Sequence, residues 1–144
     1  MSLDSISRKI IVKINGLEAN LKREIRSGLY KVGKKLVTTA NIEILKKPRS
    51  GKVYFRTLRN GTRRRHISSL PKEPWANLTG KARKGMRFNV SGSDKLIFAN
   101  TTDYVKYLEL GTSKMTKRPA MKISINKNKK NIHNILNNAI QGVS

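Results

Sequence analysis

The acidic and histidine side chains that could do acid–base or metal chemistry are few and scattered. The chain holds 8 Asp+Glu against 32 Lys+Arg, and the acids occur singly, without the paired spacing of a general acid–base pair or a metal site. The two histidines, His66 and His133, lie far apart in sequence. The absence of cysteine excludes disulfides and thiolate metal sites. We therefore expect no catalytic residues, no cofactor and no metal; the enzymatic alternative is a basic ribonuclease toxin that uses His66 and nearby arginines.

Arginines concentrate in residues 48–74, which hold no acid before Glu73. They stand near Tyr54, Phe55 and His66, a composition suited to phosphate contacts with stacking on bases or ribose. The alternative interpretation is a solvated loop, or a loop that lies on an acidic neighbour. The candidate contacts with a partner protein or with DNA are Arg56, Arg59, Arg63, Arg64 and Arg65. No helix-turn-helix, RNP-type or zinc-finger signature occurs, so sequence-specific DNA reading is not expected.

Charge and length limit the classes of protein to consider. At 144 residues with 37% hydrophobic residues, the chain is expected to fold as one domain. Its net charge of +24 repels itself and attracts polyanions. We therefore expect a compensating nucleic acid, acidic protein or anionic membrane surface. No run approaches the roughly 20 apolar residues that cross a bilayer, and no signal-peptide core is visible. We expect a protein that is made in a cytoplasm and stays there or is built there into something larger.

Residues 104–119 combine two tyrosines, an isolated glutamate, a glycine and an Arg-Pro pair. We expect a short helix over 104–110, capped by Asp103 and ended by Gly111 in a left-handed conformation. Glu109 lies between two leucines, where a carboxylate needs a cationic or amide partner. Arg118 is among the nearest arginines in sequence, and Pro119 then sets the exit direction. An internal ion pair and a contact between subunits both remain open for this glutamate.

The elements that position these residues follow from periodicity. In residues 3–46, apolar side chains recur at steps of three and four, which predicts two helices or one long helix bent near Gly28. Residues 48–74 form a basic arm, a hairpin with its turn at Asn60-Gly61.

A sheet and turn core is expected over 75–126. It contains a hairpin of strands at 86–90 and 95–100. Met121, Ile123 and Ile125 alternate like a strand, although the preceding Pro-Ala could instead open a helix. The C-terminal helix is expected over 127–142. The architecture is α+β: an N-terminal helix or helix pair, a central antiparallel sheet with the basic arm, a short helix and the C-terminal helix.

Two stretches resemble a known family. Tyr104, Tyr107, Glu109, Gly111 and Thr112, followed by Arg118 and Pro119, resemble a signature of the head–tail joining proteins of long-tailed phages. The order of Ser-Gly at 50–51, Glu-Pro at 73–74 and Thr-Gly at 79–80 is similar to the central region of that family. The sequence departs from the family where Leu110 replaces an aromatic residue and Ala120 replaces a phenylalanine.

The resemblance implies a non-enzymatic structural protein of the phage neck, a tail-completion protein located in the virion and assembled in the host cytoplasm. It implies a homo-oligomeric ring, with a hexamer expected, between the head connector and the tail terminator or tube proteins. DNA would pass through the ring, and no membrane partner is expected. Because DNA must move through the channel, we expect most arm arginines to contact partner proteins and a minority to line the lumen. The alternative is a free basic nucleic-acid-binding protein without sequence specificity.

Overall fold

The arrangement of helices and strands was obtained from a computed structural model, which describes residues 3–46, 49–76 and 79–142. The elements are α1 (Leu3–Leu45), β1 (Val53–Thr57), β2 (Arg63–Ile67), α2 (Lys81–Lys84), β3 (Met86–Ser91), β4 (Lys95–Asn100), α3 (Val105–Leu110) and α4 (Met121–Gln141). The strands form two separate antiparallel hairpins, β1–β2 and β3–β4. The predicted α+β class, the basic arm and the 86–100 hairpin are confirmed.

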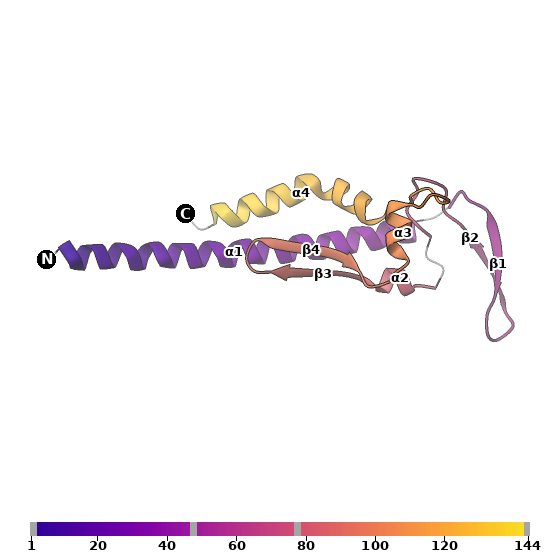
Figure 1. Ribbon diagram of the computed structural model, residues 1–144, viewed down its shortest axis with the longest axis horizontal. Helices are drawn as coiled ribbons and strands as arrows, with labels where there is room; N and C mark the ends of the chain where they lie inside the picture. The colour runs from indigo at the N-terminus through magenta and orange to yellow at the C-terminus, as the bar shows by residue number, and fades with distance from the viewer. Residues whose placement is uncertain (1–2, 47–48, 77–78, 143–144) are drawn as a thin grey trace.

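Helix α1 is the axis on which the other elements assemble (Figure 1). Helix α4 runs antiparallel along it, and the β3–β4 hairpin also packs on it. The N-terminal half of α1 extends beyond both of these elements, whereas the β1–β2 arm projects at the other end of the molecule. Both ends of the long axis therefore carry an element that projects away from the core.

The predicted weak point at Gly28 is not a break between two helices. Helix α1 continues through it, and Gly28 is buried against α4. A Cβ atom built at Gly28 would lie 3.3 Å from Cβ of Ala139 and 3.5 Å from Cδ2 of Leu136. The glycine is therefore a point of close helix contact.

A second glycine explains how the β3–β4 hairpin docks on α1. The ring of Phe88 lies so close to Gly33 that an added Cβ would sit 2.2 Å from its Cδ2. Tyr30, one turn earlier on α1, meets the same ring edge-on at 5.8 Å between centroids. Only a residue without a side chain lets Phe88 reach the helix backbone, so Gly33 fixes where the hairpin packs.

The core lies between the C-terminal half of α1, the base of the hairpin, α3 and the start of α4. Trp75 is its largest fully buried side chain in the described part of the chain, and it lies outside any helix or strand. The buried cluster consists of Ala40, Ile44, Trp75, Ala82, Met86, Val105 and Ala120. The segment 104–119 contributes Val105 to this core.

The strand interpretation of residues 121–125 is wrong, because α4 already begins at Met121. The face of α4 that meets α1 is partly polar, which obscured the helical period. Ser124 is buried and donates its hydroxyl to the carbonyl of Leu36 at 2.7 Å. Asn128 is buried one turn later and donates to Oγ1 of Thr39 at 2.9 Å. Both polar groups are satisfied across the helix interface, as buried polar groups must be.

Candidate assembly site

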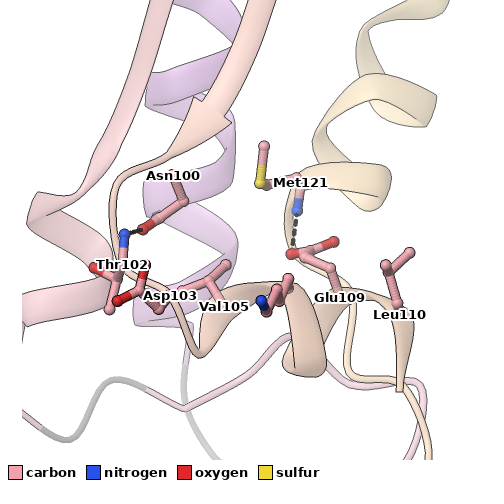
Figure 2. A pocket seen from close by; sticks show the side chains of 8 residues that line it. Asn100, Thr102, Asp103, Val105, Glu109, Leu110 and Met121 are labelled. Carbon is pink, nitrogen blue, oxygen red and sulfur yellow. Dashed lines mark hydrogen bonds between the residues drawn. The ribbon is translucent and has the colours of Figure 1, made fainter. Parts of the chain in front are cut away.

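The carboxylate of Glu109 caps the N-terminus of α4 from a different helix. Its Oε1 accepts hydrogen bonds from the backbone amides of Ala120 at 2.7 Å and Met121 at 2.9 Å. Figure 2 shows the hydrogen bond from Met121. The same oxygen accepts the indole N–H of Trp75 at 3.1 Å, and Oε2 lies 3.5 Å from the amide of Lys122. The first amides of a helix lack partners within it, and its positive dipole end favours an anion. Glu109 therefore joins α3, α4 and the buried tryptophan.

Of the partners left open for Glu109, the structure provides amides and not the cation of Arg118. No Arg118–Glu109 ion pair forms; the backbone amide of Arg118 instead donates to the carbonyl of Leu108 at 2.7 Å. The predicted Asp103 cap of α3 is wrong, since Tyr104 occupies the N-cap position and no side chain caps the helix. Pro119 is buried immediately before α4. Backbone amides and the Trp75 indole, rather than a cation, satisfy the glutamate.

Gly111 reverses the chain after α3, and its predicted positive φ is confirmed. Its φ of 82° and ψ of 178° lie in a region that is essentially restricted to glycine. The loop that follows is closed by Thr112, whose amide donates to the carbonyl of Met115 at 2.8 Å. A Cβ at Gly111 would lie 2.9 Å from that same carbonyl oxygen and 3.0 Å from the amide nitrogen of Lys117. Conformation and space both require glycine.

One side of α3 remains uncovered. Tyr104 is 44% exposed, Tyr107 49% and Leu110 80%, and the three residues recur at a spacing of three. The opposite side holds Val105 in the core, with Leu108 packed against it. We call Tyr104, Tyr107 and Leu110 the α3 patch. Beside it lies a depression of about 350 Å³, lined by Asn100, Thr102, Asp103, Val105, Lys106, Glu109, Leu110 and Met121 (Figure 2).

The base of the basic arm is tied together by Glu73. Ser50 donates its hydroxyl to Oε1 at 2.5 Å, and the amide of Leu70 donates to Oε2 at 2.8 Å. These hydrogen bonds hold the pKa of Glu73 below its usual value, and the hydrogen bond from Ser50 has the largest effect. The acid that ends the arginine-rich segment thus links the two ends of the arm.

The arm presents its five predicted contact arginines to solvent, all with exposed side chains. In the strand register, Arg65 lies opposite Phe55 and Arg64 opposite Arg56, so cations occupy both faces of the ribbon. The guanidinium of Arg63 lies over the ring of Phe55, 5.1 Å from its centroid. Arg59 lies near the turn, where Gly61 has a φ of 78°. The arrangement can meet a polyanion from either side.

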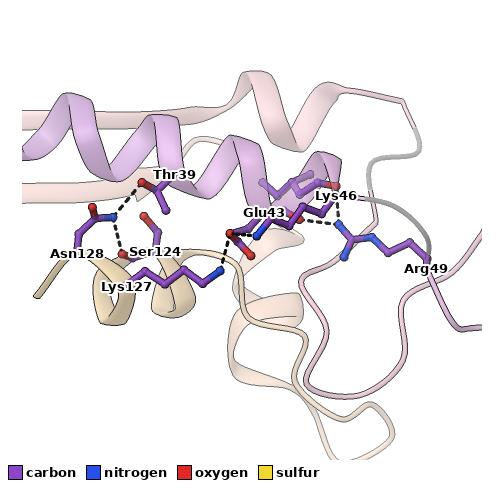
Figure 3. Close-up of polar contacts among 8 residues, drawn as sticks. Thr39, Glu43, Lys46, Arg49, Ser124, Lys127 and Asn128 are labelled. Atoms are coloured by element: carbon purple, nitrogen blue, oxygen red, sulfur yellow. Dashed lines mark hydrogen bonds and ion pairs between the residues drawn. The ribbon is translucent and has the colours of Figure 1, made fainter.

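A second polar cluster, which sequence reasoning missed, surrounds Glu43 (Figure 3). Its side chain is only 8% exposed and accepts from Lys46 and Lys127, each at 2.8 Å. Arg49 caps the same end of α1 by donating to the carbonyls of Glu43 at 2.8 Å and Ile44 at 2.6 Å. In the sequence, the signal for this cluster is an acid that stands beside Ile44 in the apolar stripe of α1. The cluster ties the ends of α1 and α4 together.

Replacing Glu43 by glutamine should remove a pH-dependent part of the stability. Burial alone would raise the pKa of Glu43, but hydrogen bonds from Lys127 and Lys46 outweigh it and lower the pKa from 4.5. A lowered folded-state pKa stabilises the fold above pH 4.5, and this contribution is lost as the pH falls through the folded-state value. We expect Glu43→Gln to cost about 1–2 kcal/mol at pH 7, since each half-exposed lysine contributes modestly.

Denaturant unfolding of wild type and Glu43→Gln between neutral and acidic pH tests this. The difference in unfolding free energy should shrink below pH 4.5. Glu18→Gln is the matched control, since Glu18 pairs with Lys22 on the exposed surface and should show a much smaller pH-dependent difference. A difference for Glu43→Gln that stays constant down to strongly acidic pH would contradict the assignment.

The two histidines occupy different elements. His66 lies on β2 opposite Tyr54, and His133 lies exposed on α4 within 3.0 Å of the Asn137 amide. Within the described ranges, no group of three or more His, Cys, Asp or Glu residues is arranged to hold a metal ion. The described helices include none with the length and apolar character to cross a membrane.

No protein-family model matches this chain, and no curated protein or solved structure is similar to it at a significant level.

Proposed function

We propose that the chain is a structural neck or tail-completion protein of a long-tailed phage. In this role it forms a ring that joins the head connector to the tail around the DNA channel. The observation that carries the proposal is the segment 104–119, whose residues resemble the head–tail joining family. Glu109 and Gly111 fix this segment to the core, and its outer side is the exposed α3 patch. A fixed element with an uncovered apolar face suits assembly.

The shape of the chain also supports an assembly role. An arm and half of a long helix project from opposite ends of a small core (Figure 1). A free globular enzyme has little use for such projections, whereas a subunit uses them to reach its neighbours. The structural role we propose needs no catalytic group.

The charge places a condition on this ring. Each subunit carries +24, so neighbouring copies repel unless acidic partner surfaces or DNA lie against them. Residues Arg56, Arg59, Arg63, Arg64 and Arg65 are exposed on the projecting arm, where they can reach an adjacent protein layer. We propose that most of them contact the connector or tail partner and a minority face the lumen.

Particles made without this protein test the function. We expect full heads and separate tails by electron microscopy, and normal virions would overturn the proposal. Complementation with a chain carrying Glu at Arg63, Arg64 and Arg65 should leave joining impaired. Reversing three exposed lysines of α1, at Lys31, Lys34 and Lys35, changes the charge equally and should preserve joining. Equal behaviour of the two charge reversals would contradict the role of the arm.

A free nucleic-acid-binding protein is the second candidate, favoured by the stacking of Arg63 on the exposed ring of Phe55. Its affinity for short duplex DNA should fall by roughly 10³ or more between about 50 and 200 mM salt if many phosphates are neutralised. A neck protein should instead bind a protein partner or assemble with itself.

A further inference from the structure

The β1–β2 arm, which projects from the core (Figure 1), carries different side chains on its two faces. Residues paired across an antiparallel ribbon share a face, and successive residues of a strand alternate between faces. The first face holds Val53, Phe55, Thr57, Arg63, Arg65 and Ile67. The second, which we call the donor face, carries Arg56 opposite Arg64 and Tyr54 opposite His66. The first face is therefore partly apolar, whereas every side chain of the donor face can donate a hydrogen bond.

Two guanidinium groups of the donor face stand side by side without a counterion. Residues directly opposite in an antiparallel pair have Cβ atoms about 5 Å apart, and like charges at this spacing destabilise the ribbon. The arm sequence holds no acid before Glu73, whose carboxylate accepts from Ser50 and Leu70 at the base of the arm. In the described part of the chain, no ion pair reaches Arg56 or Arg64. An anion from outside the chain would relieve their repulsion.

The donor face has the groups that bind a phosphate. Arginine forks bind phosphate through two parallel hydrogen bonds, and Arg56 and Arg64 can approach one phosphate from neighbouring strands. Tyr54 is 53% exposed and lies two residues before Arg56, about 7 Å along the strand. There its hydroxyl can donate to a neighbouring phosphate of the same backbone. The face therefore matches a chain of phosphates.

The first face fits a protein surface better than a polyanion. Val53 is 45% exposed and Phe55 60% exposed, so apolar area is available beside the cations. The guanidinium of Arg63 lies 5.1 Å from the centroid of the Phe55 ring, which gives this cation a partner within the chain. Aromatic residues and arginine are enriched in protein interfaces. One thin ribbon can thus meet two different partners through its two faces.

The aromatic content of the donor face favours duplex DNA over a single strand. Proteins that hold single strands stack successive bases on several aromatic side chains. On the donor face Tyr54 is exposed but His66 is half-buried, which leaves one free ring. Duplex DNA keeps its bases stacked and presents its phosphates, which are the groups that paired arginines bind.

We propose that Arg56 and Arg64 bind the phosphate backbone of duplex DNA, which leaves the first face of the arm to the partner protein. This inference deepens the proposed function by naming the two arginines that face the channel, and it rests on that function for the source of the DNA. Binding of DNA through the donor face is itself a property of the isolated protein.

Two double variants that remove equal charge from opposite faces test the assignment. Arg56→Gln with Arg64→Gln changes the donor face, and Arg63→Gln with Arg65→Gln changes the first face. Fluorescence anisotropy measures the affinity of each variant for a short duplex between about 50 and 200 mM salt. The donor-face variant should bind at least about tenfold more weakly at fixed salt. Its salt slope should fall by about 1–2, since each phosphate contact contributes about 0.9.

The first-face variant is the matched control. Its affinity for the duplex should change by less than about threefold, because charges on the far side of the ribbon are screened within about 8–10 Å. Arg56→Lys with Arg64→Lys keeps the charge of the donor face and should restore most of the salt slope. This recovery separates loss of charge from misfolding of the arm.

Equal losses for the two faces would overturn the proposal, as would a lysine variant that behaves like the glutamine variant. Tighter binding of a single strand of oligothymidylate than of the duplex would overturn duplex DNA as the ligand. Binding of poly-glutamate that depends equally on Arg56 and Arg64 would overturn DNA in favour of an acidic protein.

These outcomes are distinct from failure of the proposed function. If duplex binding depends on the donor face but particles lacking the protein are normal, the function alone fails. If joining requires the protein but the two faces contribute equally to DNA binding, the assignment of the donor face alone fails.

Discussion

Replacing Glu109 by alanine should lower the free energy of unfolding by about 3–5 kcal/mol, because it leaves several buried donors without an acceptor at once. The carboxylate accepts from the amides of Ala120 and Met121 and from the indole of Trp75. Each buried donor left unsatisfied costs about 1–3 kcal/mol, and the positive end of α4 loses its anion as well. In a domain whose total stability is about 5–15 kcal/mol, this is a large fraction.

Two further variants separate the charge from the geometry. Glu109→Gln keeps one acceptor oxygen but adds an amide N–H₂ that faces donors, so we expect a smaller loss of about 1–3 kcal/mol. Asp103→Ala removes an acid that lines the same depression but is exposed and does not cap α3, so its effect should stay within about 0.5 kcal/mol. Urea unfolding followed by circular dichroism measures all three. Equal stability of Glu109→Ala and Asp103→Ala would show that the carboxylate does not hold α4.

Glu109→Ala should also weaken self-assembly under conditions in which the protein is still folded. The α3 patch stands on the helix that Glu109 joins to α4, so loosening this connection lets the patch shift relative to α1. A contact built from exposed apolar residues depends on their fixed arrangement. The hydrogen bonds of Glu109 therefore support both the stability of the fold and the position of the α3 patch as a proposed assembly surface.

Local signals in the sequence were enough to predict several elements. Alternation over 86–90 and 95–100, separated by a turn, predicts the β3–β4 hairpin, since side chains of a strand alternate between faces. Asn60-Gly61 predicts the tip of the arm, and Gly111 predicts the end of α3. Each of these signals depends on residues close together in sequence and on the backbone angles that glycine permits.

Contacts between distant elements were harder to predict. Glu109 was expected to need a polar partner, but the partners are backbone amides eleven and twelve residues later and an indole on a separate segment. Backbone donors exist at nearly every residue, so sequence cannot indicate which ones a carboxylate meets. Gly28 shows the same limit. In the sequence, a glycine within a helical pattern indicates a bend, but in the structure its lack of a side chain allows close contact with Ala139.

The start of α4 shows a different limit. Its inner face includes Ser124 and Asn128, which are buried because α1 offers them hydrogen-bond partners. Periodicity counts such residues as polar and assigns them to solvent, so the apolar residues that remain alternate like a strand. A polar helix interface is recognised only once both helices are in place.

The second large effect is expected at Gly111, where alanine should cost about 2–4 kcal/mol through backbone strain and a steric clash together. With φ at 82° and ψ at 178°, the residue occupies a conformation that costs a residue with a Cβ about 1–3 kcal/mol. The new Cβ would also lie 2.9 Å from the carbonyl oxygen of Met115, which is backbone and cannot rotate away. That carbonyl accepts the amide of Thr112, so relieving the clash disturbs the loop.

Gly61→Ala is the matched control because it separates the two causes. Gly61 also has a positive φ, 78°, but a Cβ there would meet nothing within 4 Å. Its substitution should cost about 1 kcal/mol from strain alone. We expect Gly111→Ala to lose more stability than Gly61→Ala and to lose self-assembly as well, since the loop it disturbs leads from the α3 patch to Glu109's contacts on α4. If both variants unfold at the same urea concentration and Gly111→Ala assembles normally, this turn is an ordinary loop without a role in presenting the α3 patch.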